Sequence, residues 1–236
     1  MKAILLAAGK STRLKDLSSD TPKPMLSIKG EIVLEHNIRW LKKSGIEDIY
    51  INLHYLPDTI KDYFKDGDRF GVKISYSYEK NILGTAGGVK QIAGLYSKDN
   101  WDENFLVVYG DSFYPFDYDL GKLINFHKEK NALMSVGLYK KKSEVWKSGV
   151  AIITQNGKIQ KFVEKPNPKE IDSNLINTGI YILNPEIIRH IPDGFSDFSQ
   201  DIIPKLLRKR LPVFGYVFGK GLTPIDTPEL LKKANK

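Results

Sequence analysis

Strand-like and helix-like segments alternate through the first half of the chain, and this alternation restricts the fold more than any other feature. Apolar or period-two runs predict strands at 2–8, 48–53, 72–78 and 104–109. Helical spacing of apolar residues predicts helices at 31–44, 57–64, 85–95 and 119–129. Strands joined through helices make right-handed crossovers, so the sequence predicts an α/β, Rossmann-like, mostly parallel mixed sheet with helices on both faces.

The second half is richer in strand patterns. Strands are expected at 132–139, 149–154, 158–163 and 175–183, with a hairpin turn at 155–158. We expect these strands to extend the sheet and to add a small β layer over the active site. Two helices should follow, one after Phe198 and a final one with Thr227 as N-cap and Pro228 at its first position. Without a linker or repeat, we expect one domain over residues 1–236.

Charge and composition limit the classes of partner. The 236 residues carry a net charge of +8, but the basic residues are scattered and form no nucleic-acid-binding motif. This favours small phosphorylated molecules over nucleic acid. No apolar run reaches the roughly 18 residues that a membrane span needs, and the run at 3–8 is too short for a signal peptide. Because the chain has no cysteine and nothing suggests export, a cytoplasmic protein is expected.

The two loops expected at the carboxyl ends of strands carry the candidate chemistry. Strand 2–8 runs into a small-residue loop at Gly9, whose backbone N–H groups can hold phosphate oxygens. Arg13 and Lys23 can neutralise a triphosphate, although an ordinary turn with solvated basic residues would look similar. Asp111 follows strand 104–109, where a carboxylate can hold Mg²⁺ against phosphates or simply cap a turn. The spacing of neither a P-loop nor a dinucleotide-binding loop is present.

Seven short motifs occur in the order found in one enzyme family. They are LAAGKSTRL (6–14, with Leu5 before it), TPKPML (21–26), LGTAGG (83–88), GDS (110–112), FVEKP (162–166), NTGIY (177–181) and TPE (227–229). Together these motifs resemble the signature of the sugar-1-phosphate nucleotidyltransferases, and the resemblance covers the whole chain. It implies a transferase that uses a nucleoside triphosphate and a sugar 1-phosphate to make a nucleotide sugar and pyrophosphate, with Mg²⁺ as cofactor.

The resemblance also implies a role for particular residues. Catalysis is assigned to Arg13, Lys23 and Asp111, of which Asp111 also binds the metal. The residues matching nucleotide contacts are Leu6, Ala7, Ala8, Gly9, Glu79, Gly84 and Gly87. Those matching sugar-phosphate contacts are Gly149, Glu164, Lys165 and Asn177, with the glutamate on sugar hydroxyls and the lysine on the phosphate. Judged without the resemblance, a Glu-Lys pair at a strand end is usually solvated surface.

Two positions depart from the family pattern. The loop Gly9-Lys10-Ser11 lacks the second glycine that many members carry. The family's second metal aspartate precedes the last helix, but an ungapped match puts Pro224 there. Either Asp226 supplies the ligand after a one-residue shift, or Asp111 and the nucleotide phosphates hold the metal with waters; we expect Asp226.

The substrates are less constrained than the reaction. The segment from Ser148 onward looks most like the guanylyltransferases that act on mannose 1-phosphate or manno-heptose 1-phosphate. Uridylyl, thymidylyl or cytidylyl transfer to another sugar phosphate, alcohol or amine stays open. A non-catalytic regulatory paralogue that binds nucleotide sugars is a further alternative function. Whatever the function, the chain is also a candidate for association into a homo-oligomer. The sequence shows no hexapeptide repeats, so no C-terminal left-handed β-helix is expected.

Overall fold

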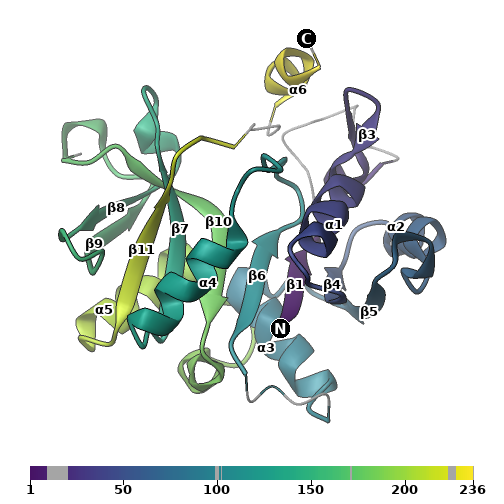
Figure 1. Cartoon of the computed structure of the whole chain (residues 1–236), viewed down its shortest axis with the longest axis horizontal. Coiled ribbons are helices and arrows are strands. Elements are labelled where there is room, and N and C mark those ends of the chain that lie inside the picture. The colour runs from purple at the N-terminus through teal and green to yellow at the C-terminus, as the bar shows by residue number, and fades with distance from the viewer. Residues whose placement is uncertain (10–20, 99–100, 102, 171, 223–226, 236) are drawn as a thin grey trace. The chain divides into compact units, whose positions relative to one another are not determined.

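The computed structural model (Figure 1) describes residues 1–9, 21–98, 101, 103–170, 172–222 and 227–235. The chain divides into two compact units that are interleaved in sequence. The first consists of Met1–Ile82, Val108–Asp117 and Leu222–Lys236, and the second of Leu83–Val107 and Tyr118–Gly221. Strand β6 (Phe105–Tyr109) begins in the second unit and ends in the first. The expectation of one domain over residues 1–236 stays a prediction.

The first unit is built on a parallel sheet. Its strands pair in the order β1 (Lys2–Leu6), β4 (Asp48–Leu53) and β5 (Lys73–Tyr78). Helices α1 (Val33–Lys43) and α2 (Pro57–Phe64) provide the crossovers between these strands. The middle of β1 is fully buried, which explains its uninterrupted apolar sequence. The predicted strand–helix alternation of this part of the chain is therefore confirmed.

A short hairpin precedes α1 and meets a helix from the far end of the sequence. Strands β2 (Ser27–Ile28) and β3 (Glu31–Ile32) pair antiparallel, so the prediction that the helix begins at residue 31 was two residues early. Helix α6 (Pro228–Ala234) has Thr227 as its N-cap, as predicted. Just after α6, Asn235 Oδ1 accepts a hydrogen bond from the backbone N–H of Lys29 in the hairpin at 2.7 Å.

The second unit contains mainly antiparallel strands. In it, β10 (Leu175–Leu183) pairs antiparallel with β7 (Met134–Lys140) and with β8 (Gly149–Ile153), and β8 pairs with β9 (Ile159–Glu164). The predicted turn at 155–158 joins β8 to β9, and its Gly157 has a φ of +86°. Strand β11 (Val213–Phe218) pairs parallel with β7 and was not predicted.

Helices α3 (Gly84–Leu95), α4 (Leu120–Glu129) and α5 (Ile203–Arg208) complete the second unit. The helix predicted after Phe198 is present, but its first turn, Phe198–Ile202, is a π-helical turn that leads into α5. The predicted α/β fold class, with a mixed sheet and connecting helices, is thus confirmed. Within the described part of the chain, none of the helices combines the length and apolarity that crossing a bilayer demands.

His127, on α4, makes the stability of the protein depend on pH. The side chain is buried, and Nδ1 lies 2.9 Å from Ser135 Oγ. Burial lowers the pKa of His127 from 6.5 to about 4. His127 is therefore protonated near pH 6.5 in the unfolded chain but only near pH 4 in the native state. Because protonation favours the unfolded state between these values, the free energy of unfolding falls as the pH falls from 6.5 to 4.

We expect the urea midpoint of the wild type to fall more between pH 7 and pH 5 than that of His127→Gln. Any fixed cost of the substitution is the same at both pH values and drops out of the comparison. Equal falls in the two proteins would contradict the lowered pKa of His127.

Candidate active site

Lys23 and Asp111, two of the three residues assigned to catalysis, are in direct contact. Lys23 Nζ donates a hydrogen bond to Asp111 Oδ2 at 2.7 Å. The lysine side chain is only 9% exposed, whereas the carboxylate is 35% exposed. Lys23 begins the 3-10 turn Lys23–Met25, in which flanking prolines restrict the backbone. A mostly buried cation thus lies beside a partly exposed carboxylate, two groups that are able to bind a phosphate and a metal ion respectively.

The backbone on both sides of Asp111 is held by buried elements. The N–H of Gly110 donates to the carbonyl of Leu6 at the end of β1, with an N–O distance of 2.9 Å. From α1, the fully buried Asn37 donates from Nδ2 to the carbonyl of Ser112 at 2.8 Å. Asp111 therefore extends from a loop whose position is fixed by β1 and α1.

A buried amide connects the loop after β1 with Glu79. The N–H of Ala7 donates to Asn52 Oδ1 at 2.7 Å, and Asn52 Nδ2 donates to Glu79 Oε1, also at 2.7 Å. Glu79 is 1% exposed and Asn52 is 2% exposed. Sequence reasoning missed Asn52, although an amide inside the apolar strand β4 is a signal, because a buried amide needs partners. The predicted nucleotide residues Ala7 and Glu79 are thus brought together.

The other residues predicted for the nucleotide in the first unit continue the same stretch. Leu6 and Ala8 are each 8% exposed. Gly9 is exposed, and a Cβ added to it would meet nothing within 4 Å. Packing among the described residues therefore does not require glycine at this position. We still predict that the missing side chain lets a ligand approach the backbone.

Gly84 and Gly87, at the start of α3, have a packing role that the sequence did not reveal. Gly84 has a φ of +73°, and a Cβ there would lie 2.4 Å from the carbonyl oxygen of Ser196. At Gly87 a Cβ would lie 2.4 Å from the carbonyl oxygen of Gly194. Both glycines allow residues 194–196 to pack on the first turn of α3. Their contact with a nucleotide stays a prediction.

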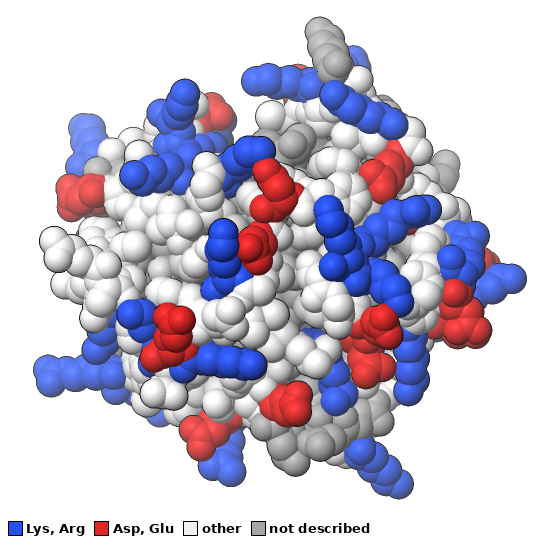
Figure 2. Space-filling view, in the orientation of Figure 1, with Lys and Arg blue, Asp and Glu red and all other residues white. Residues whose placement is uncertain are grey.

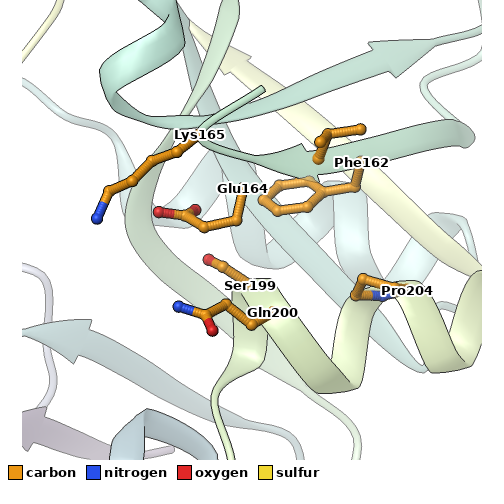
Figure 3. A pocket seen from close by; sticks show the side chains of 7 residues that line it. Phe162, Glu164, Lys165, Ser199, Gln200 and Pro204 are labelled. Atoms are coloured by element: carbon orange, nitrogen blue, oxygen red, sulfur yellow. The ribbon is translucent and has the colours of Figure 1, made fainter. Parts of the chain in front are cut away.

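A pocket of about 470 Å³ lies in the second unit, between the end of β9 and the π-helical turn (Figure 3). It is lined by Phe162, Val163, Glu164, Lys165, Ser199, Gln200 and Pro204. Figure 3 shows the Glu164 carboxylate above Ser199 and Gln200, with the Lys165 side chain extending beside it. The predicted pair Glu164 and Lys165 therefore lines a cavity. Ser199 and Gln200 were not predicted as site residues.

Gly149 and Asn177 adjoin this pocket. Gly149 pairs with Glu164 across β8 and β9, and a Cβ at Gly149 would lie 2.7 Å from Glu164 Oε2. Asn177 Nδ2 donates to Ser199 Oγ at 3.2 Å and to Tyr181 Oη at 2.6 Å. The structure therefore brings together all four residues predicted for the sugar phosphate. The absent side chain at Gly149 leaves the space that the carboxylate occupies.

Electrostatics distinguish the two charged residues of the pocket. Burial raises the pKa of Glu164 above its ordinary value, and the nearby charge of Asp197 adds to this, while Lys165 and a hydrogen bond from Ser199 oppose it. Lys165 is exposed and has a φ of +47°, in the left-handed region that side chains other than glycine rarely adopt. Six other described residues that are not glycine also have a positive φ, so this conformation alone does not mark Lys165 as functional.

Two predicted residues, Arg13 and Asp226, lie outside the described residues, as does Pro224. The choice between Asp226 and Pro224 at the second metal position therefore stays a prediction. Within the part of the chain that the structure describes, no group of three or more His, Cys, Asp or Glu side chains lies close enough to share a metal ion. Asp111 is thus the one predicted metal ligand that can be placed.

Comparison with protein families agrees with this arrangement. Residues 2–221 match the family model described as nucleotidyl transferase. The chain belongs to this family. The matched residues include the strand and loop with Leu6 to Gly9, the Lys23–Asp111 pair and the Glu164–Lys165 pocket.

Among curated relatives in the nucleotidyl transferase family, a UTP–glucose-1-phosphate uridylyltransferase of Synechocystis is 40% identical over 225 residues, or 91% of this chain. A mannose-1-phosphate guanyltransferase of Yarrowia lipolytica is 34% identical over 208 residues, or 87% of this chain. The chain spans 57% of the length of the first relative and 55% of the second.

Solved structures support the same fold. HddC from Yersinia pseudotuberculosis, also solved in complex with GMP-PN, is 28% identical and has a TM-score of 0.81, with 99% of this chain and 97% of that chain covered. A glucose-1-phosphate thymidylyltransferase described for Bacillus anthracis has a TM-score of 0.86 over 100% of this chain and 94% of that one. At 24% identity, the second likeness concerns the fold alone.

Proposed function

We propose that the chain transfers a nucleoside monophosphate from a nucleoside triphosphate to a sugar 1-phosphate, giving a nucleotide sugar and pyrophosphate. The observation that carries this proposal is the 2.7 Å contact between Lys23 Nζ and Asp111 Oδ2, which places a mostly buried cation beside a partly exposed carboxylate. The Glu164–Lys165 pocket supports the choice of a sugar phosphate as the second substrate. Lys and Arg side chains are interspersed with Asp and Glu on the face in Figure 2, which favours small-molecule substrates over nucleic acid.

Mg²⁺ suits the oxygen donor that the structure provides. It is commonly bound by one or two carboxylates together with substrate phosphates, and Asp111 presents a partly exposed carboxylate at the end of β6. Asp111 would hold the ion, with Asp226 as the proposed second ligand. When bound, Mg²⁺ neutralises charge on the phosphates and lowers the cost of the developing negative charge.

The chain's own residues would position and stabilise the reactants. An oxygen of the sugar 1-phosphate attacks the α-phosphorus, the bond between the α- and β-phosphates breaks, and pyrophosphate leaves with the electron pair. Lys23, and by resemblance Arg13, would stabilise the charge around the α-phosphate and the leaving group. Lys165 would bind the phosphate of the sugar, and the Glu164 carboxylate would accept hydrogen bonds from sugar hydroxyls. Catalysis of this kind is mostly positioning and charge stabilisation.

Two substrate pairs are favoured by different observations. The likeness to HddC, solved with GMP-PN, and the guanyltransferase relative favour GTP with mannose 1-phosphate or a manno-heptose 1-phosphate. The 40% identical uridylyltransferase favours UTP with glucose 1-phosphate. The deciding experiment tests ATP, GTP, CTP, UTP and dTTP, each with mannose 1-phosphate, manno-heptose 1-phosphate and glucose 1-phosphate. The readout is pyrophosphate release. Nucleotide binding without pyrophosphate release from any pair would favour the regulatory paralogue instead.

Lys165→Ala should raise KM for the sugar 1-phosphate by roughly tenfold or more, with a much smaller change in KM for the nucleotide. The substitution removes one charge–phosphate contact from the pocket, and a charge-assisted contact is worth about 1.5–3 kcal/mol. Steady-state kinetics with each substrate varied in turn measures both constants. Lys161→Ala, on β9 just before Lys165 and also exposed, is the matched control. An equal rise in both KM values would assign Lys165 a different role.

A further inference from the structure

We propose that Thr85 and Asp197 are positioning residues that transmit nucleotide binding at the start of α3 to the sugar-phosphate pocket. The proposal rests on the proposed function, because it takes Gly84 and Gly87 as nucleotide contacts and the Glu164–Lys165 pocket as the sugar-phosphate site. Neither Thr85 nor Asp197 is assigned to either substrate. Both lie in the second unit, where the stretch of residues 196–200 connects the start of α3 with the pocket.

One end of this stretch is fastened to the first turn of α3 through the backbone. The carbonyl oxygen of Ser196 accepts hydrogen bonds from the N–H groups of Ala86 and Gly87, at 3.0 and 3.2 Å. The N–H of Ser196 in turn donates to the carbonyl oxygen of Leu83 at 2.9 Å. These bonds satisfy N–H groups that a helix start otherwise leaves without partners. A displacement of the first turn of α3 therefore moves Ser196 with it.

Asp197 stands at the middle of the stretch and bonds in both directions. Its Oδ2 accepts a hydrogen bond from Thr85 Oγ1, on α3, at 2.8 Å. Its Oδ1 accepts from the N–H groups of Ser199 and Gln200, at 2.8 and 3.3 Å. Thr85 Oγ1 also accepts from the N–H of Phe198 at 2.9 Å. One carboxylate and one hydroxyl therefore join α3 to the π-helical turn Phe198–Ile202, a connection that we call the Thr85–Asp197 link.

The other end of the stretch forms the wall of the pocket. Ser199 and Gln200 line the cavity opposite Glu164 and Lys165 (Figure 3). Ser199 is 4% exposed and also accepts a hydrogen bond from Asn177, so its position is defined from two sides. Because Asp197 holds the N–H groups of both wall residues, the orientation of this wall depends on where the carboxylate lies. That position in turn depends on Thr85.

A contiguous hydrogen-bonded path of this length can carry coupling between two ligands, and such coupling is reciprocal. A nucleotide that orders the first turn of α3 would fix Thr85, then Asp197, and then the wall formed by Ser199 and Gln200. The sugar 1-phosphate would consequently bind more tightly to the nucleotide-loaded protein than to the free protein. Measured coupling of this type is about fivefold or more.

Thr85→Val tests the link, because valine keeps the shape of threonine and lacks the hydroxyl. Thr85→Ser, which keeps the hydroxyl, is the matched control. The readout is hydrogen exchange of peptides covering residues 83–88 and 197–202, measured with GTP or UTP alone, so that no turnover is involved. In the wild type and in Thr85→Ser, we expect the nucleotide to slow exchange in both peptides. In Thr85→Val the slowing should persist at 83–88 and be lost at 197–202.

Kinetics supply the second readout. In Thr85→Val the KM for the sugar 1-phosphate should rise about fivefold, with Thr85→Ser within twofold of the wild type. If Thr85→Val is unstable, Asp197→Asn replaces it, because asparagine still accepts from the N–H groups of Ser199 and Gln200 but loses the carboxylate that accepts from Thr85.

The outcomes separate this inference from the proposed function. Slowed exchange at 197–202 that survives in Thr85→Val would overturn the link even if the protein turns over sugar 1-phosphates. Loss of slowing in Thr85→Val, in a protein that releases no pyrophosphate with any substrate pair, would support the link and overturn the proposed reaction. Absence of nucleotide protection at both peptides in the wild type would overturn the link, and pyrophosphate release would decide the proposed reaction separately.

Discussion

Asp111→Asn is expected to lower the rate of pyrophosphate release by roughly a hundred- to a thousandfold, the range seen when one preorganised electrostatic group is removed from an active site. Asparagine has nearly the same shape as aspartate, and its carbonyl can still accept the hydrogen bond from Lys23 Nζ. Packing and the thermal midpoint should therefore change little. The lost negative charge weakens Mg²⁺ binding, so the variant should need more Mg²⁺ to reach its half-maximal rate.

The matched control for this change is Asp119→Asn. Asp119 caps α4 by accepting a hydrogen bond from the N–H of Lys122 at 3.0 Å, and asparagine caps a helix about as well as aspartate. This control removes the same charge from a position that is not assigned to catalysis. Turnover in Asp111→Asn within tenfold of the wild type at saturating Mg²⁺ would remove Asp111 from the metal site.

Gly84→Ala should lower the stability of the protein by about 2–5 kcal/mol. The left-handed backbone at φ +73° costs about 1–2 kcal/mol for a residue with a Cβ. Contact of that Cβ with the Ser196 carbonyl oxygen, which would be only 2.4 Å away, adds about 1–3 kcal/mol because backbone must move. For a chain of this length, the corresponding fall in Tm is about 5–15 °C.

Gly94→Ala, in the same helix, is the control for Gly84→Ala. A Cβ at Gly94 would meet nothing within 4 Å, so alanine should stabilise the helix by up to about 1 kcal/mol. Calorimetry on the two variants measures both effects. A Gly84→Ala protein as stable as the wild type would mean that residues 194–196 can move away from α3 without cost.

Local sequence signals predicted most of the secondary structure, because the elements involved have clear periods and ends. The bounds of β4, α2 and β10 were predicted to the residue. Strand β11 was missed because Gly215 interrupts its apolar run, and a central glycine normally argues against a strand. The structure shows why glycine is needed there: a Cβ at Gly215 would lie 2.5 Å from Leu138 Cδ1 on the neighbouring strand β7.

The candidate site likewise contains residues that sequence motifs predicted and residues that the sequence did not reveal. Motifs with a fixed order predicted Lys23, Asp111, Glu164 and Lys165 as site residues, and the last three lie at or just after the end of a strand. Residues that act through a partner far away in sequence carry no local signal. Thr85 and Asp197 are 112 residues apart, and Asn52 and Glu79 are 27 residues apart. Only the folded chain reveals that these polar groups satisfy one another.

The hydrogen bond between Lys29 and Asn235 joins positions 206 residues apart in the sequence. During synthesis on the ribosome, the hairpin that contains Lys29 emerges long before α6, and the second unit emerges in between. The first unit therefore cannot complete its contacts until α6 has emerged, whereas most of the second unit is available earlier. Contacts of such high separation also slow folding, because a long loop must close before they form. Emergence of α6, rather than emergence of the first segments, should set the moment at which the contacts of the first unit become complete.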